Sequence, residues 1–418
     1  STMKFLHVSD LHFGKVIHGV SMLENGDQPH WADRFLALAE EVRPDAVVIA
    51  GDVYDRSPPS GEAVTLMSRM LVGLESLGIA VLLVAGNHDS GPRLAFASEI
   101  LARQNIHIAG RVKRKMERVM LRDGFGEVHF WLMPYVFPAA VAQVLGDEEI
   151  RDYDTAVRRL IAEQEIDTSV RNVIIAHQNV TVNGKEMERG GSESAVGGVG
   201  QVGHSAFDGF DYVALGHIHA AYKVGREAVR YAGSPLCYHF DETLRPAKGP
   251  ILVEMGEKGS DLRMETLHIE PLHPMRIMKG EAGALYEQEL ARGTRGEYLK
   301  LIITDKPMTP EISDRFQALA ESRGSVLMER VSEFRHISAE TETPDGVVVR
   351  EKSLEELFAD FYQQRVGEEP DDKDFRLLHY AGELLRNTPF EGSKADVADE
   401  KLKNQLLTFL MKQEESKQ

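Results

Sequence analysis

Five short polar clusters, each placed directly after an apolar run, constrain this chain more than any other feature of its sequence. The apolar runs are residues 5–8, 46–50, 80–84, 173–176 and 212–215. They are short, rich in β-branched residues and bounded by turn formers, so they predict buried strands rather than helices. The clusters that follow them are Asp10-Leu11-His12, Gly51-Asp52, Gly86-Asn87-His88-Asp89, His177-Gln178 and Gly216-His217-Ile218-His219.

Polar residues in this position are expected to converge. In open α/β sheets, ligands bind beyond the carboxyl ends of the strands, so residues that are distant in sequence meet at one edge. Asp, Asn and neutral His offer the mixed oxygen and nitrogen donors that suit Mn²⁺, Fe²⁺ or Zn²⁺. The single cysteine, Cys237, lies outside the clusters, which argues against a thiolate zinc site.

The spacing within two clusters favours a pair of metal ions. In Asp10-x-His12 and His217-x-His219 the polar residues stand at i and i+2, which places both side chains on one side of an extended segment. Two such pairs with a carboxylate can enclose two ions about 3.5–4 Å apart, the separation used for in-line attack on phosphorus. Asp52 is the candidate for the bridging carboxylate.

Each cluster alone has a simpler explanation. A single histidine after a strand, such as His177, is more often a satisfied core or surface residue than a ligand. Asp-Leu-His and Gly-Asp sequences are also common in turns. The occurrence of all five clusters in order, each at a predicted strand end, favours a two-metal hydrolytic centre instead.

The order of these clusters resembles the calcineurin-like metallophosphoesterases over residues 1–270. Within that superfamily, several segments are similar to the SbcD family of bacterial nuclease subunits, which work with the ATPase SbcC. The segments that carry this similarity are 9–12, 51–55, 57–60, 214–219 and 231–235. The resemblance implies an α/β fold, the layered α/β sandwich of metallophosphoesterases, with a small α+β capping domain and a C-terminal helical tail.

The resemblance also implies a role for each polar residue. One metal would be held by Asp10, His12, Asp52 and His219, and the second by Asp52, Asn87, His177 and His217. The expected cofactor is two Mn²⁺ ions, although the same donors accept Mg²⁺, Fe²⁺ or Zn²⁺. His88 would act on the substrate, by stabilising the developing charge or protonating the leaving oxygen, an effect of about 10²–10⁴-fold.

A carboxylate is expected to orient His88. Asp55 is preferred, because the second Asp of the Gly-Asp-x-x-Asp pattern pairs with the motif histidine in related phosphatases; Asp89 is the alternative. Asp55-Arg56 also reproduces a pattern of protein and nucleotide phosphatases, in which the arginine binds a terminal phosphate. That detail keeps a phosphomonoesterase function open.

The length of the chain predicts more than one domain, because 418 residues exceed the size of a single core. Residues 1–270 would form the metallophosphoesterase domain. After a break at 271–274, residues 271–339 predict the capping domain; its expected strands are 275–278, 298–303 and 326–330, and its expected helices are 285–291 and 312–322.

Residues 340–418 predict a linker followed by helices with apolar residues at helical spacing. The resemblance favours docking of these helices on an SbcC-type ATPase. A self-packed pair or triplet of helices is the simpler alternative. The chain contains no G-x-x-x-x-G-K-[ST] motif, so an ATPase activity would have to come from another chain.

Charge and composition set further limits. The net charge of −18 has the wrong sign for binding DNA by long-range attraction alone. The clearest basic run contains Arg111, Lys113, Arg114 and Lys115; it is a candidate DNA contact, although most charged runs are solvated surface. One cysteine, no signal region and no long apolar run predict a cytoplasmic, nucleoid-associated protein with no membrane segment.

Three classes of function therefore compete. The leading one is a DNA nuclease subunit with 3′-to-5′ double-strand exonuclease and single-strand or hairpin endonuclease activity in DNA repair, replication and recombination. It would form a homodimer within a heterotetramer with its ATPase partner. The second class is a phosphomonoesterase or nucleotide phosphodiesterase of the same superfamily. The third is a non-catalytic scaffold, which the intact ligand set disfavours.

Overall fold

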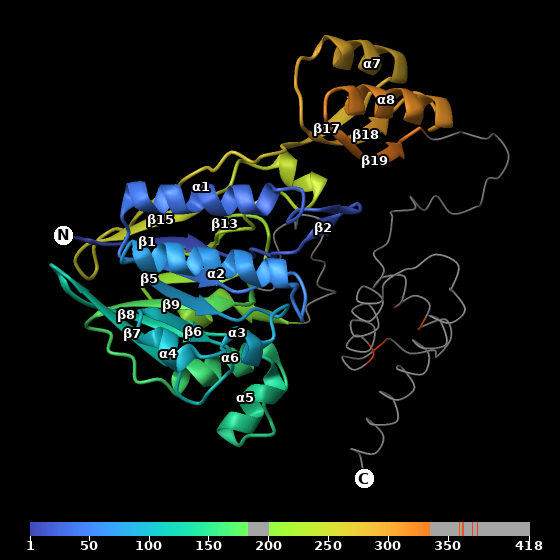
Figure 1. Ribbon diagram of the computed structural model, residues 1–418. Coiled ribbons are helices and arrows are strands. Elements are labelled where there is room, and N and C mark those ends of the chain that lie inside the picture. Colours follow the sequence, from blue (N-terminus) through green and yellow to red (C-terminus); the bar gives the residue numbers. More distant parts are fainter. Residues whose placement is uncertain (183–199, 335–358, 360–361, 363–369, 371–373, 375–418) are drawn as a thin grey trace. The chain divides into compact units, whose positions relative to one another are not determined.

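The computed structural model describes residues 1–182 and 200–334, together with residues 359, 362, 370 and 374 (Figure 1). The two long ranges belong to one compact unit, Ser1–Glu193 with Gly200–Ala339. The helical tail predicted for 340–418 lies outside the described residues, apart from the four single positions. None of the helices in the described ranges has the length and apolar character needed to span a membrane.

The first of two large sheets contains the three apolar runs nearest the N-terminus. Its strand order is β16-β15-β1-β4-β5-β6, and β1, β4, β5 and β6 are parallel. The antiparallel β15 and β16 extend it beyond β1, so a segment far along the chain returns to the sheet. The bounds are β1 Met3–Val8, β4 Ala46–Ala50, β5 Ala80–Val84, β6 Ile106–Ala109, β15 Ile251–Met255 and β16 Arg263–Thr266.

The second large sheet contains the other two runs. Its strand order is β13-β14-β12-β9-β8-β7, with β14, β12, β9 and β8 parallel and the edge strands antiparallel. The bounds are β7 Glu117–Asp123, β8 Gly126–Met133, β9 Arg171–His177, β12 Tyr212–Gly216, β13 Tyr222–Val224 and β14 Arg226–Tyr231. All five predicted strands therefore exist, divided between two sheets.

The two sheets pack face to face and helices cover their outer faces, which confirms the layered α/β sandwich. Phe5 of β1 contacts Phe130 of β8 and Tyr212 of β12, with ring centroids 5.5 and 5.4 Å apart. Helices α1 (Asp27–Val42) and α2 (Gly61–Ser76) pack on the first sheet, and α5 (Pro138–Leu145) and α6 (Tyr153–Ala162) on the second (Figure 1). Burial on both faces explains why the central strands are continuous apolar runs.

The shorter elements lie in the connections between these layers. They are β2 (Val16–Ile17), β3 (Val20–Ser21), α3 (Gly91–Leu94), α4 (Ser98–Ala102), β10 (Asn179–Thr181), β11 (Gln201–Gly203) and the 3₁₀ helices His204–Phe207 and Phe240–Leu244. Strands β2 and β3 form a hairpin in the connection between β1 and α1. None of these short elements was predicted, because each has too few residues to establish a period.

A separate three-stranded sheet with two helices follows residue 274; we call it the capping module (residues 275–332). Its elements are β17 (Met275–Gly280), α7 (Ala282–Ala291), β18 (Tyr298–Ile303), α8 (Pro310–Ser322) and β19 (Val326–Ser332). The strands are parallel in the order β17-β18-β19. The strands and helices predicted for this stretch are confirmed, with both helices beginning two or three residues earlier than predicted.

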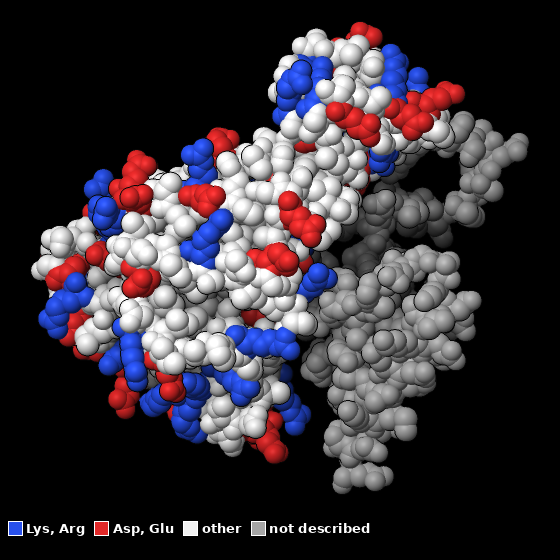
Figure 2. Space-filling model, viewed as in Figure 1, with Lys and Arg blue, Asp and Glu red and all other residues white. Residues whose placement is uncertain are grey.

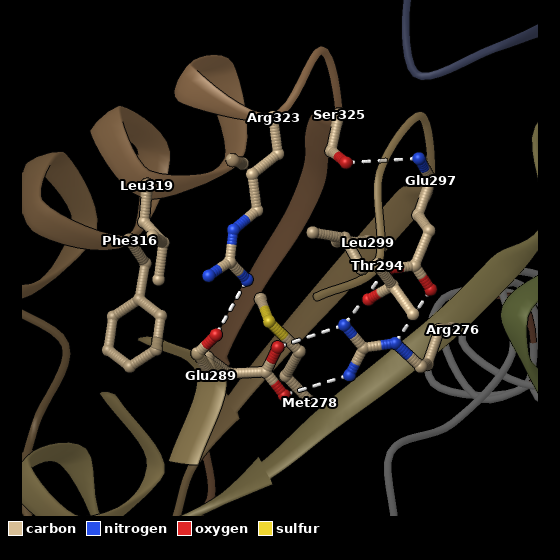
Figure 3. Close-up of a pocket in the computed structure, with 11 residues that line it drawn as sticks. Arg276, Met278, Glu289, Thr294, Glu297, Leu299, Phe316, Leu319, Arg323 and Ser325 are labelled. Carbon is tan, nitrogen blue, oxygen red and sulfur yellow. Dashed lines mark hydrogen bonds and ion pairs between the residues drawn. The ribbon is translucent and has the colours of Figure 1, made fainter. Parts of the chain in front are cut away.

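A network of charged side chains lines a pocket in the capping module (Figure 3). Arg276 donates two hydrogen bonds to the Glu289 carboxylate, at 2.8 and 2.9 Å, and Nε donates to Glu297 Oε2 at 2.8 Å. Both carboxylates are buried, and Arg323 Nη1 donates to the main-chain oxygen of Glu289 at 2.6 Å. Arg276 therefore compensates two buried negative charges between the sheet and α7.

Replacement of Arg276 by leucine is expected to destabilise the capping module. It would leave Glu289 and Glu297 buried without a cation, a loss of about 3 kcal/mol in the free energy of unfolding. Urea denaturation measures the effect. Arg295→Leu, which alters an exposed arginine of the same module, is the control and should change the stability little. Equal stability of the two variants would contradict the assignment.

Candidate metal centre

The carboxyl ends of five parallel strands, from both large sheets, meet at one edge of the sandwich. The clusters after β1, β4 and β5 come from the first sheet, and those after β9 and β12 from the second. The two sheets are joined there directly, because His177 Nδ1 donates to the carbonyl oxygen of Ala50 at 2.7 Å. The expected convergence of the polar clusters is therefore observed, across two sheets.

Two glycines of the clusters permit this close approach. A Cβ on Gly86 would lie 2.1 Å from Asp52 Oδ1, and a Cβ on Gly216 would lie 1.8 Å from the carbonyl oxygen of Ala50. Both distances are too short for any side chain. Glycine at these positions therefore lets the backbone of one strand end pack against the polar groups of another.

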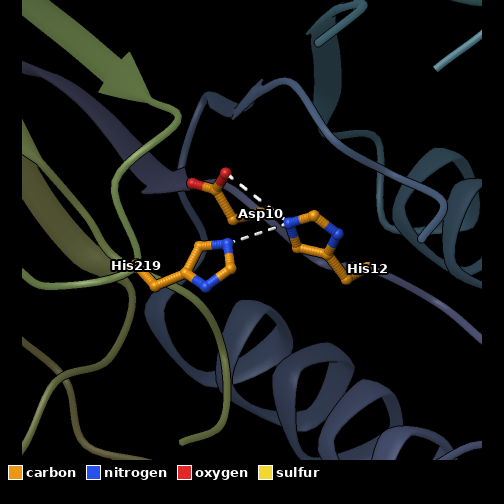
Figure 4. A group of neighbouring side chains, drawn as sticks. All are labelled: Asp10, His12 and His219. Carbon is orange, nitrogen blue, oxygen red and sulfur yellow. Dashed lines mark hydrogen bonds and ion pairs between the residues drawn. The ribbon is translucent and has the colours of Figure 1, made fainter. Parts of the chain in front are cut away.

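The first group of side chains contains Asp10, His12 and His219 (Figure 4). His12 Nε2 and His219 Nε2 lie 3.0 Å apart, and His12 Nε2 lies 3.9 Å from Asp10 Oδ1. Burial lowers the pKa of His12 to about 4 and that of His219 to about 3, so both imidazoles are neutral near pH 7. Neutral imidazole nitrogens that face each other beside a carboxylate fit a cation between them.

The second group contains Asn87, His177 and His217. Asn87 Oδ1 lies 2.9 Å from His177 Nε2 and 3.2 Å from His217 Nδ1. Burial alone would lower the pKa of His177, but the charge and hydrogen bond of Asp52, with the charge of Asp10, raise it to about 10. A divalent cation at this position would take over the role of that proton as the charge that balances the carboxylates.

Asp52 lies between the two groups. Its Oδ1 accepts a hydrogen bond from the backbone N of His88 at 2.9 Å. Its Oδ2 is buried without a hydrogen bond of good geometry, 3.2 Å from His177 Nε2 and 3.5 Å from His12 Nε2. The charges of His177 and His88 hold the pKa of Asp52 well below its usual range, against the effect of burial.

An unsatisfied buried carboxylate oxygen calls for a ligand. Here that oxygen lies within reach of nitrogen donors from both groups, as a carboxylate shared by two cations would. The oxygen and nitrogen donors of Asp52, Asn87 and the histidines match the preferences of divalent first-row metals. The residues of the two groups therefore fit divalent metal ions.

The ligand-bearing turns have an unusual backbone. Asp10, His12, Asp52 and His217 have φ angles of 54°, 46°, 51° and 107°, in the left-handed region that non-glycine residues rarely adopt. The sequence analysis explained the i, i+2 spacing by an extended segment, and that reason was wrong. Asp10 and His12 converge through left-handed turns, and His217 and His219 face different groups.

The structure gives Asp55 a different contact from the one expected. His88 Nδ1 donates to the main-chain oxygen of Asp55 at 3.0 Å. The Asp55 carboxylate instead lies 3.3 Å from His12 Nδ1 and 3.5 Å from Lys15 Nζ. Burial opposes ionisation, but the hydrogen bond with His12 and the charge of Lys15 lower the pKa of Asp55 to about 2. The carboxylate is thus placed to orient a candidate metal ligand.

Asp89, the alternative partner of His88, joins two of the strand-end loops. Its carboxylate accepts hydrogen bonds from the backbone N of Val53, Tyr54 and Gly86, at 3.2, 3.1 and 2.9 Å. Burial and the charge of Asp52 raise the pKa of Asp89 to about 6. These contacts fix the loop after β4 against the loop after β5.

Tyr135 is a residue of the site that the sequence analysis missed. Its ring lies nearly parallel to that of His217, with centroids 6.2 Å apart and an interplanar angle of 29°, and edge-on to His177 at 6.1 Å. Its backbone N donates to the oxygen of Ala85 at 2.8 Å. Tyr135 follows β8, so the end of the apolar run 128–133 was the available signal.

The basic run after β6 is partly engaged within the protein. Arg114 donates to Glu163 Oε2 at 2.9 Å and to the Leu145 oxygen at 3.2 Å, and Lys115 donates to the Glu163 main-chain oxygen at 2.6 Å. Arg111 and Lys113 are exposed. On the face drawn in Figure 2, basic and acidic side chains are interspersed.

Comparison with known proteins gives two family matches. A family described as "Calcineurin-like phosphoesterase" matches residues 3–221, and one described as "Type 5 capsule protein repressor C-terminal domain" matches residues 271–366. A dimetal phosphatase from Danio rerio is a similar solved structure, with a TM-score of 0.38 and 12% identity over 65% of this chain and 98% of that one. The two family matches include the sandwich and the capping module.

Two curated relatives are named as SbcD, the nuclease component of SbcCD. The protein from Staphylococcus epidermidis is 25% identical over 387 residues, which cover 90% of this chain and 98% of the relative. The protein from Staphylococcus saprophyticus is 29% identical over 301 residues, which cover 71% of this chain and 77% of the relative. The first similarity therefore extends over nearly the whole length of both proteins.

Replacement of Gly86 by alanine is expected to disrupt the centre, because the added methyl group would displace the Asp52 carboxylate. We expect metal affinity to fall at least about 10-fold, as for other changes that misplace ligands. Isothermal titration with Mn²⁺ after chelation measures it. Gly61→Ala, at a helix start with open space around the added Cβ, is the control and should bind as the wild type. Wild-type affinity in Gly86→Ala would contradict this role.

Proposed function

We propose that this chain, which belongs to the calcineurin-like phosphoesterase family, is the nuclease subunit of an SbcCD-type complex and hydrolyses phosphodiester bonds of DNA. The observation that carries the chemistry is the buried Asp52 Oδ2 between two groups of metal-type donors. Similarity to two relatives named as components of a nuclease supports DNA as the substrate.

In this proposal Asp10, His12, Asp52 and His219 hold one metal, and Asp52, Asn87, His177 and His217 hold the second. We assign both positions to Mn²⁺, which this donor set accepts together with other divalent ions. When bound, a pair of such ions activates water near neutral pH and neutralises charge on the phosphate. The low pKa of Asp52 keeps the shared carboxylate ionised for this task.

His88 is proposed to act on the leaving group. The main-chain oxygen of Asp55 can only accept, so Nδ1 of His88 carries a proton and Nε2 is the atom available to the substrate. The ring lies next to that of His12, with centroids 5.0 Å apart, at the edge of the first ligand group. A protonated His88 at this position would donate its Nε2 proton to the leaving oxygen of the phosphodiester.

His88→Gln is expected to separate turnover from metal binding. Turnover should fall by about 10²–10⁴-fold, because the proton donor is lost. Metal content, measured by inductively coupled plasma mass spectrometry, should stay at two ions per chain. His107→Gln, a half-buried histidine on β6, is the control and should retain turnover. Full activity of His88→Gln would contradict the mechanism.

The remaining parts of the chain fit a larger assembly. We assign residues 1–270 to the nuclease domain, 271–339 to the capping domain and 340–418 to the linker and helices that bind an SbcC-type ATPase. A homodimer within a heterotetramer, 3′-to-5′ exonuclease and endonuclease activities in DNA repair, and a cytoplasmic, nucleoid-associated location complete the proposal. Arg111 and Lys113 are the better candidates for DNA contact in the basic run, because Arg114 and Lys115 are bound to Glu163 or its main chain.

A phosphomonoesterase remains the second candidate, on one observation. Arg56, exposed and next to Asp55, stands where phosphatases of the Gly-Asp-x-x-Asp-Arg pattern bind a terminal phosphate.

Incubation of the purified chain with Mn²⁺ should discriminate the two candidates. We expect cleavage of labelled duplex ends and single-stranded circles, abolished by chelation and restored by Mn²⁺, because the donors require a divalent ion. Gel electrophoresis follows the DNA, and absorbance follows a chromogenic phosphomonoester in parallel. The His88→Gln protein controls for contaminating nucleases. Hydrolysis of the monoester with intact DNA would overturn the nuclease assignment.

A further inference from the structure

Gln28 is a buried polar residue in the first turn of α1, outside both ligand groups, with a side chain that is only 1% exposed. Its Nε2 donates to the carbonyl oxygen of His12 at 2.8 Å and lies 3.3 Å from that of Leu11. Its Oε1 accepts from the backbone N of Gly14 at 2.9 Å. One side chain therefore holds three peptide groups of the turn after β1.

Tyr238 completes this support. Its hydroxyl donates to the carbonyl oxygen of Leu11 at 2.6 Å and accepts from Gln28 Nε2 at 2.9 Å. Its ring lies edge-on to both His12 and His219, with centroids 6.0 Å apart in each case. The contacts of Gln28 and Tyr238 thus act on the turn that carries His12 at φ 46°, a conformation that needs support from its surroundings.

Asp27, the neighbour of Gln28, contacts the capping module. Tyr298, the first residue of β18, donates its hydroxyl proton to Asp27 Oδ2 at 2.5 Å. His273 Nδ1 lies 2.9 Å from Asp27 Oδ1, and Asn25 Nδ2 donates to the Tyr298 hydroxyl at 2.5 Å. Asp27 is 2% exposed, so this junction is as dry as the turn that Gln28 supports.

We infer that Asp27 and Gln28 couple the capping module to the half of the metal centre built around His12 and His219. Gln28 is a positioning residue, since it acts through the backbone of a ligand. Adjacent residues of one helical turn move together, so a shift of Asp27 at the junction displaces Gln28 at the turn. The inference rests on the proposed metal centre but not on the identity of the substrate.

The coupling predicts a selective effect on one of two metals. Calorimetric and electron paramagnetic resonance titrations with Mn²⁺ on the full chain resolve the two binding steps. Gln28→Leu should weaken one step by about 10–100-fold, the range for residues that orient metal ligands, and leave the other within about 2-fold. His219→Gln, which removes a ligand of the same half, identifies the affected step. Tyr238→Phe keeps the ring, removes the hydroxyl and should weaken the same step if Gln28→Leu does not fold.

The capping side of the coupling has its own matched pair. Tyr298→Phe removes only the hydroxyl that binds Asp27, and should weaken the same step by about 5-fold, at the low end of measured couplings between sites. Tyr286→Phe is the control within the same module; its ring packs on Phe316 at 5.4 Å and should leave both steps unchanged. Circular dichroism verifies that each variant folds.

The outcomes separate this inference from the proposed function. If the wild type binds no pair of Mn²⁺ ions, the proposed metal centre fails. If the wild type binds two ions and both Gln28→Leu and Tyr238→Phe bind as the wild type, or weaken both steps equally, the positioning role is overturned. If Tyr298→Phe and Tyr286→Phe behave alike, the coupling to the capping module is overturned.

Discussion

The contact between the ends of the two large sheets is the constraint on which the site depends. His177, at the end of β9 in one sheet, donates to the carbonyl oxygen of Ala50, at the end of β4 in the other. This bond brings Asp52 to within 3.2 Å of His177 Nε2. Because neither sheet contains both candidate ligand groups, the centre exists only where the sheets meet in this register. Gly86 and Gly216 make the approach possible, since any larger residue would occupy the space of a neighbouring polar group.

The sequence was sufficient to predict the strands, the polar edge and the capping module, for physical reasons that are specific to each. The five apolar runs are bounded by glycine and acidic residues, so their period and length were unambiguous. The capping module alternates short strands with amphipathic helices, a pattern that indicates parallel crossover units. The division of the five strands between two sheets could not be predicted, because strand pairing depends on contacts that are distant in sequence.

Details of the site were also beyond prediction. The left-handed backbone of Asp10 and His12 follows from tertiary contacts such as those of Gln28, and residue type alone does not specify it. Asp55 contacts His88 through its main chain and His12 through its side chain, a distinction that no sequence pattern records. The ligand assignments themselves remain predictions, supported by geometry. Tyr135 and Tyr238 follow no motif and became visible only when the strand ends were brought together.

The division of the centre between two sheets also has a consequence for folding. A cation that binds ligands from both sheets has high affinity only for the closed sandwich, so its binding free energy adds to the stability of the native state. At a free concentration 100 times the dissociation constant, one such ion contributes about 2.7 kcal/mol. The metal would therefore act as a clamp between the two halves of the domain. Chain that has lost its metal would open first at the edge where the active residues lie, which links metal supply in the cell to the lifetime of the folded protein.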